Sequence, residues 1–181
     1  MKILHPFVLA VAAVAAVVAC AASSRTWAAP AHEHGVAQLD VAVEAQRVTL
    51  DLQVPLDSLL GFEHAPRTDA QRQRADAAIA RLRAAGELFR IDSAAACTLD
   101  KVTLVAPTLG LGGKPGDKDA HADLDAHFEF ACKAGARARH IEVGLFDAYP
   151  GLRRIELQVI TSKGQMKARL QRPASRVSLV R

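Results

Sequence analysis

The chain has 181 residues, half of them hydrophobic, with 23 lysines and arginines against 19 aspartates and glutamates. This length is enough for one domain with a substantial core. The formal charge of +4 includes Lys2 and Arg25 of an expected leader segment. Because the remaining charges nearly balance and only 4% of the residues are aromatic, composition argues against a protein that binds nucleic acid.

Residues 1–29 have the composition of an export signal. Lys2 precedes an almost wholly apolar run from Ile3 to Ala22, and Thr26-Trp27-Ala28 resembles a small-residue cleavage site. We therefore expect a periplasmic protein whose mature chain begins near Ala29. A lipoprotein anchored at Cys20 is the alternative, because Val17-Val18-Ala19-Cys20 resembles a lipidation motif. No later segment approaches the roughly 20 apolar residues of a transmembrane helix.

The first elements predicted beyond this segment are two strands. Apolar and polar residues alternate from Val36 to Glu44 and again from Arg47 to Val54, with only Ala45-Gln46 between them. This spacing predicts a hairpin. Pro55 ends the second strand, and residues 56–66 are expected to form a structured loop.

A helix is predicted next, capped by Thr68 or Asp69, running through Ala85 and ended by Gly86. Its apolar side chains fall on one stripe, and arginines occupy the other faces. The stripe consists of Ala75, Ala78, Ile79, Leu82 and Ala85.

Two further strands, Cys97 to Ala106 and His121 to Cys132, flank a flexible loop over 107–120 that is rich in glycine, lysine and aspartate. Pairing them antiparallel with Cys97 opposite Cys132 sets Ala106 opposite Asp123. We predict a disulfide at the open end of this hairpin, because an even pair of cysteines in an exported chain is typically oxidised. Two unpaired buried thiols are the alternative.

The remaining segments predict more strands, at 139–145, 152–160, 165–170 and 176–180. Many strands and one main helix indicate a single α+β domain over 30–181, built mainly of antiparallel sheet, in one layer or in two packed sheets.

Two groups of histidines suggest metal binding. His32 and His34 lie on one side of an extended backbone, roughly 6.6 Å apart at Cα, which suits two ligands of one ion; a solvated chain end is the alternative. Histidine with carboxylate favours zinc, and copper is the main competitor because it binds such ligands more tightly.

The second group is His121, Asp123, Asp125 and His127, which share one strand face. From His121 to His127 a strand spans roughly 20 Å, so only one end can join the first group. We choose His121 with Asp123 and expect His127 on an exposed sheet face.

Glu63-His64 lies in the loop beyond the first hairpin. His64 is a candidate fourth ligand or a structural hydrogen-bond partner. Glu63 is a candidate ligand or a group that orients a ligating imidazole.

Several of these motifs together resemble the ZrgA-like family of exported bacterial zinc-binding proteins. They are His-Glu-His-Gly-Val-Ala-Gln-Leu-Asp at 32–40, Pro-Leu-Asp-Ser-Leu-Leu-Gly-Phe-Glu-His-Ala-Pro at 55–66, His-Ala-Asp at 121–123, and Cys132. The resemblance extends from about residue 31 to the C-terminus and implies zinc binding linked to uptake, rather than catalysis. The member that typifies this family carries a long histidine-rich tract between the strands that correspond to 97–106 and 121–132. Residues 110–119 take its place here and contain no histidine, which puts a zinc-collecting role of that tract in doubt for this chain.

An enzyme is not favoured, because the chain lacks Gly-x-Ser-x-Gly, His-Glu-x-x-His and a phosphate-binding glycine loop. The alternatives to a zinc-binding protein are a metal-free structural or interaction domain of the envelope and a zinc hydrolase with Glu63 or Asp125 as its base. We expect a non-enzymatic protein accessory to zinc uptake or homeostasis, with a membrane uptake system as its partner. The candidate ligands are His32, His34, Glu63, His64, His121 and Asp123.

Overall fold

The computed structural model of the protein describes residues 33–112 and 122–180. The expected signal peptide, His32 and His121 lie outside these ranges. Among the described residues, no helix is long and apolar enough to cross a membrane.

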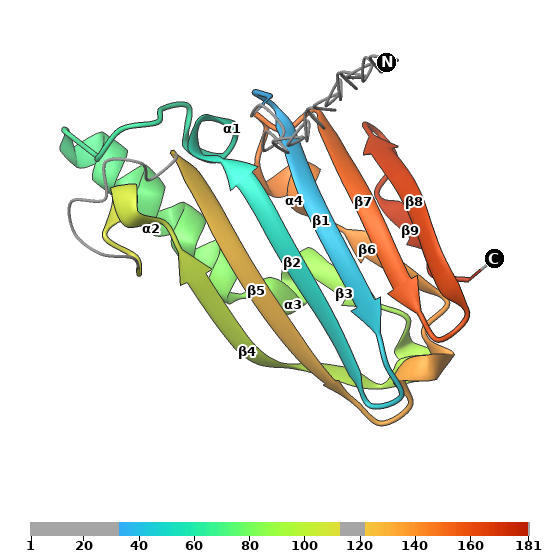
Figure 1. Ribbon diagram of the computed structural model, residues 1–181. Coiled ribbons are helices and arrows are strands. Elements are labelled where there is room, and N and C mark those ends of the chain that lie inside the picture. The colour runs from blue at the N-terminus through green and yellow to red at the C-terminus, as the bar shows by residue number, and fades with distance from the viewer. Residues whose placement is uncertain (1–32, 113–121, 181) are drawn as a thin grey trace, which may run out of the picture. The chain divides into compact units, whose positions relative to one another are not determined.

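The main layer is a six-stranded sheet with the order β4-β5-β2-β1-β7-β8 (Figure 1). Neighbouring strands are antiparallel except β1 and β7, which are parallel. The predicted first hairpin is confirmed as β1 and β2. The strands of this sheet are β1 (Val36–Val43), β2 (Arg47–Pro55), β4 (Cys97–Val105), β5 (Asp123–Cys132), β7 (Arg154–Thr161) and β8 (Gly164–Gln171).

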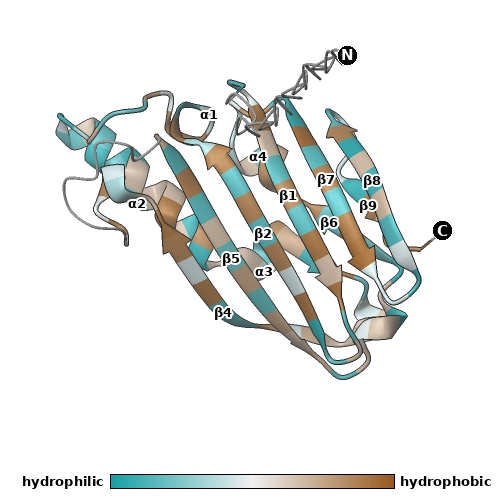
Figure 2. Ribbon diagram, in the orientation of Figure 1, coloured by the Kyte–Doolittle hydropathy of each residue, from teal (hydrophilic) through white to brown (hydrophobic). Residues whose placement is uncertain are grey.

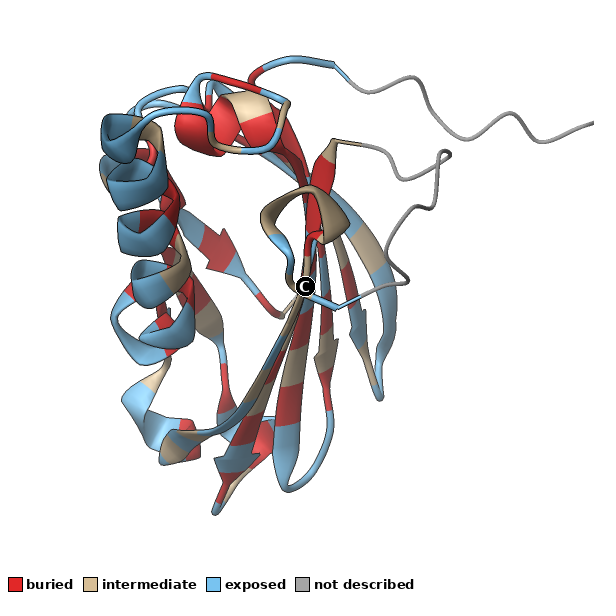
Figure 3. Ribbon diagram, turned by 90° about the vertical axis from the view of Figure 1, so that its left-hand side faces the viewer, coloured by how far each residue is buried: buried red, intermediate tan, exposed pale blue. Residues whose placement is uncertain are grey.

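A second layer covers one face of this sheet (Figures 1 and 3). It contains a three-stranded sheet of β3 (Phe89–Ile91), β6 (His140–Val143) and β9 (Arg176–Ser178), in the order β3-β6-β9. It also contains the long helix α2 (Asp69–Arg83) and the short helices α1 (Leu56–Leu60), α3 (Ala85–Leu88) and α4 (Leu145–Ala148). Two mainly antiparallel sheets with one long helix confirm the predicted α+β class.

The core lies between the two layers because the strands alternate in polarity (Figure 2). In β2, Val48, Leu50, Leu52 and Val54 are buried, whereas the residues between them face outward. Phe128 of β5 meets Phe89 of β3 with ring centroids 5.1 Å apart, which joins the large sheet to the small one. One face of the large sheet is therefore apolar and covered, and the other carries its polar side chains.

The predicted disulfide between Cys97 and Cys132 is present, and the two cysteines are opposite each other in β4 and β5. The predicted register holds only as far as Leu99. An irregularity between Leu99 and Lys101 shifts it, so Val105 pairs with Asp125 and the expected pairing of Ala106 with Asp123 is wrong. The extra residue lies where Asp100 and Lys101 are both exposed, so the alternation of β4 changes phase there, as it does at a β-bulge.

The helical segments differ from the prediction at two places. Helix α2 begins as expected, with the Thr68 side chain accepting a hydrogen bond from the Gln71 amide, but it ends at Arg83. Gly86 lies inside α3 instead of ending the helix, because the chain turns at Ala84 so that Ala85 is buried. Residues 56–60, expected in a loop, form helix α1.

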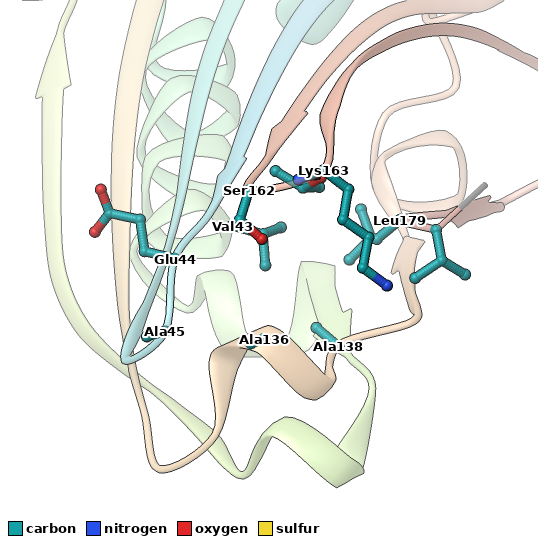
Figure 4. A pocket seen from close by; sticks show the side chains of 10 residues that line it. Val43, Glu44, Ala45, Ala136, Ala138, Ser162, Lys163 and Leu179 are labelled. Carbon is teal, nitrogen blue, oxygen red and sulfur yellow. Dashed lines mark hydrogen bonds between the residues drawn. The ribbon is translucent and has the colours of Figure 1, made fainter.

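The far end of β1 borders a small cavity of about 130 Å³, shown in Figure 4. Val43, Ala138 and Leu179 contribute apolar walls, and Lys163 and Glu44 are its charged lining residues. The lining contains neither histidine nor cysteine, so this cavity does not offer the ligands that zinc prefers.

Candidate metal centre

Three potential metal ligands meet where β1 begins. His34, Asp57 and Glu63 each offer one ligand atom, and these atoms lie within 4.8 Å of one another. The His34 ring donates a hydrogen bond from Nδ1 to Asp57 Oδ2, and its Nε2 lies 3.7 Å from Glu63 Oε1. The group is at the surface, since 63% of the His34 side chain, 24% of that of Asp57 and 45% of that of Glu63 are exposed.

The position of His34 is set by the turn that leads into β1. The Val36 amide donates to the Glu33 carbonyl at 3.0 Å, and Gly35 adopts a left-handed φ of +80°. The Gly35 carbonyl accepts from the amides of Arg153 and Arg154 at 2.8 and 3.0 Å, which fastens the turn to the start of β7. A side chain at Gly35 would be strained in this conformation and would collide with the Arg153 guanidinium, so the turn requires glycine.

Asp57 is placed by α1, which begins directly after the last residue of β2. The next residue, Ser58, is 3% exposed. Its hydroxyl accepts a hydrogen bond from the Gly35 amide at 2.8 Å and donates one to Asp57 Oδ1 at 3.0 Å. One buried hydroxyl therefore links the backbone next to His34 to the carboxylate of Asp57.

Glu63 lies in the loop after α1. Gly61 ends the helix in the left-handed conformation, with φ +78°, and its amide donates to the Asp57 carbonyl at 2.7 Å. This cap reverses the chain, so Glu63 returns toward His34. The neighbouring His64 is not part of the cluster: its ring stacks on Phe62 at 5.3 Å and its Nδ1 lies 2.9 Å from the Ala65 carbonyl oxygen.

The carboxylates dominate the electrostatics of the group. The hydrogen bond to Asp57, together with the charge of Asp57, raises the pKa of His34 above its ordinary value. The charge of Glu63 also raises the pKa of His34, to a smaller extent, whereas the charge of Arg153 lowers it. Arg153 also donates to the His34 carbonyl at 2.5 Å, while Arg154 forms an ion pair with Glu33 at 2.6 Å. These arginines hold the backbone of the turn and leave the His34 ring facing the two acids.

The other candidate residues lie elsewhere or outside the described residues. Asp123 is buried at the start of β5, opposite Pro55. The residue before it, Ala122, accepts a hydrogen bond from the Leu56 amide at 2.8 Å, so the chain just before β5 lies against the start of α1. His127 lies on the outer face of the large sheet, as expected, beside Asp51.

Sequence reasoning did not single out Asp57. It lies within the motif at 55–66, but an acidic residue in the first turn of a helix is common for electrostatic reasons alone. Only the fold shows that this carboxylate faces an imidazole that precedes it by 23 residues.

The ligand types of this cluster fit a divalent zinc ion. One imidazole and two carboxylates are among the ligands that zinc accepts, and three protein ligands leave one tetrahedral position for water or an incoming donor. The negative charges of the two carboxylates offset the positive charge of the ion. Copper would also bind these donors, because its affinity for nitrogen and oxygen ligands exceeds that of zinc.

The comparison with known families agrees with this chemistry. Residues 31–179 match the family described as ZrgA family zinc uptake protein. The chain belongs to the ZrgA family. A search of curated proteins finds no significant match. The ZrgA match begins before the His34 turn and includes α1 and Glu63, so the whole candidate metal centre lies within the family region.

Proposed function

We propose that this ZrgA-family protein binds a zinc ion in the periplasm at His34, Asp57 and Glu63 and holds it for a zinc uptake system. The observation that carries the proposal is the convergence of one imidazole and two carboxylates from three separate segments at the start of β1. Membership of the ZrgA family, which is described as a family of zinc uptake proteins, supports the link to zinc uptake. A disulfide is typical of oxidising compartments, which supports export.

The exposure of the cluster suits a protein that delivers its ion. Structural zinc sites are closed by four ligands, whereas an exposed site with three protein ligands admits a further donor. A ligand from an acceptor protein can therefore approach the ion before His34 releases it. We keep His32 and His121 as predicted additional ligands, because His32 precedes His34 by one intervening residue and His121 precedes the segment that contacts α1.

A zinc titration of the metal-free mature chain against a competing chelator tests this proposal. We expect one tight equivalent for the wild type, and its loss when His34→Ala and Asp57→Asn are combined. Copper is titrated in parallel to rank the two metals.

His140→Ala is the matched control. Its ring also lies beside a carboxylate, with Nδ1 3.4 Å from Asp92, but its Nε2 is 2.6 Å from the Arg176 guanidinium, so a cation already occupies that side. We expect this variant to bind zinc like the wild type. Unchanged tight binding in the His34/Asp57 double variant would contradict the proposed site, and absence of binding in the wild type would favour a metal-free envelope domain.

A further inference from the structure

The cavity beyond the end of β1 lies where segments from distant parts of the chain meet (Figure 4). They are the turn between β1 and β2, residues 136–138, the turn between β7 and β8, and the residues that follow β9. Protein interiors contain few voids larger than a water molecule. A space of about 130 Å³ at this junction is therefore a candidate for ligand binding.

Backbone contacts hold the walls of this cavity in place. The Gly135 amide donates to the Ala45 carbonyl at 2.7 Å, which fastens residues 136–138 to the first hairpin. A Cβ at Gly135 would lie 2.3 Å from the Glu44 carbonyl oxygen, so this close approach requires glycine. On the opposite wall, the Leu179 amide donates to the Arg139 carbonyl at 2.8 Å. The cavity is thus formed without a ligand.

The lining is apolar inside and cationic at its rim. Val43, Ala138 and Leu179 are buried and provide apolar walls. Lys163 is exposed in the turn between β7 and β8, and its side chain extends from that turn alongside Leu179 (Figure 4). Glu44 is the one acid of the lining, and its carboxylate points away from the Lys163 side chain (Figure 4).

The charge of Lys163 is available to a ligand. Among the residues that the structure describes, no carboxylate forms an ion pair with its ammonium group. An ammonium group offers only hydrogen-bond donors, so the group that it recognises is an anion or another acceptor. A ligand that matches both parts of the lining therefore combines a compact hydrocarbon group with a negative charge.

The volume limits the size of that hydrocarbon group. A dry apolar cavity of roughly 150 Å³ accommodates benzene, so a cavity of about 130 Å³ has room for one small ring or one branched alkyl group. We propose that this cavity binds a small apolar monocarboxylate. Its hydrocarbon part lies between Val43, Ala138 and Leu179, and its carboxylate meets the Lys163 ammonium.

This binding site is separate from the metal centre. The eight residues of β1 span roughly 25 Å, with the metal centre where the strand begins and the cavity beyond its end. The carboxylate site therefore does not depend on the proposed zinc function, and it is tested on metal-free protein with chelator present.

The experiment titrates the ¹⁵N-labelled mature chain with benzoate and with isocaproate at neutral pH and follows the backbone amide signals by NMR. We expect saturable shifts centred on Ala138, Lys163 and Leu179. Benzamide, which has the same ring without the charge, should bind more weakly than benzoate. Acetate, which has the charge without the hydrocarbon group, should produce no saturable shift.

Lys163→Met removes the charge and keeps an unbranched side chain of similar length. An ion pair at an exposed rim contributes at most about 1 kcal/mol, so benzoate affinity should fall by about fivefold, to the affinity of benzamide. Lys163→Arg should retain benzoate binding. Lys133→Met is the matched control, because Lys133 is exposed in the connection between β5 and β6 and does not line the cavity.

The wild-type titrations give an answer that does not depend on any variant. The absence of saturable shifts with both carboxylates, or shifts centred on other residues, would overturn the proposal. So would equal affinities of the wild type for benzoate and benzamide, or a Lys163→Met variant that binds benzoate as tightly as the wild type does.

Discussion

Ser58 joins the two segments that provide His34 and Asp57, and replacing it with alanine tests how that geometry is maintained. Ser58 is 3% exposed, and the change removes its hydroxyl, which accepts a hydrogen bond from the Gly35 amide at 2.8 Å and donates one to Asp57 Oδ1 at 3.0 Å. The substitution leaves the ligand side chains of His34 and Asp57 chemically unchanged. Any loss of zinc affinity must therefore come from their positioning.

The magnitude follows from these two contacts. A buried amide that loses its acceptor costs about 1–3 kcal/mol, so Ser58→Ala should lower the free energy of unfolding of the metal-free protein by about that amount. Groups that orient metal ligands typically contribute 10- to 100-fold in affinity. We therefore expect zinc affinity to fall by a factor of about 10–100, with the number of bound ions unchanged.

Two assays separate these effects: denaturant unfolding with chelator present, and zinc titration against a competing chelator. Ser162→Ala is the matched control, because Ser162 is exposed in the turn between β7 and β8. An exposed substitution of this kind should change stability by less than about 0.5 kcal/mol. If Ser58→Ala unfolds and binds zinc like the wild type, the hydroxyl does not position the ligands.

Three further predictions concern the disulfide, an alkaline transition and the pH dependence of zinc binding. Cys97 and Cys132 are separated by 35 residues, so reducing their disulfide should lower the free energy of unfolding by about 4 kcal/mol in the chain-entropy model. Denaturant unfolding with and without reductant measures this loss, and equal midpoints would contradict it. Burial raises the pKa of Tyr149 to about 12, so the unfolded chain loses the phenolic proton first and stability should fall as pH rises from about 10 to 12. Thermal melts over this pH range should show a smaller fall in melting temperature for Tyr149→Phe than for the wild type, and equal falls would contradict the prediction. Asp57 raises the pKa of His34, so protons should begin to displace zinc from this ring at a higher pH than from an ordinary histidine, and zinc affinity should weaken as pH falls. Competition titrations at a series of pH values test this, and constant zinc affinity through the imidazole range would refute it.

Local patterns were sufficient to predict much of the fold. The strands β1 and β2 alternate strictly in polarity, and the pairing of Cys97 with Cys132 follows from aligning two neighbouring strands. The parallel pairing of β1 with β7 was not predicted, because it joins segments that are distant in the chain and neither strand carries a signal for the other. The register shift in β4 was missed although the polar pair Asp100-Lys101 interrupts the alternation, so that the half-buried positions move from Cys97 and Leu99 to Val102 and Leu104.

The candidate site was predictable only in part. His34 and Glu63 were recognised from their residue types and the resemblance of their motifs, and the fold brings them together. Asp57 was missed because its role depends on the Gly61 cap, the Ser58 hydroxyl and the turn at Gly35, all of which are tertiary features. His64 had the right residue type, but stacking on Phe62 places its ring outside the cluster.

A crystal structure of the mature protein with zinc, with the ion located by its anomalous scattering, would show directly which residues bind the metal. We expect an ion about 2.0–2.2 Å from a ring nitrogen of His34 and from carboxylate oxygens of Asp57 and Glu63. A tightly bound zinc ion held by other residues, with these three side chains making no contact with it, would contradict the proposed centre.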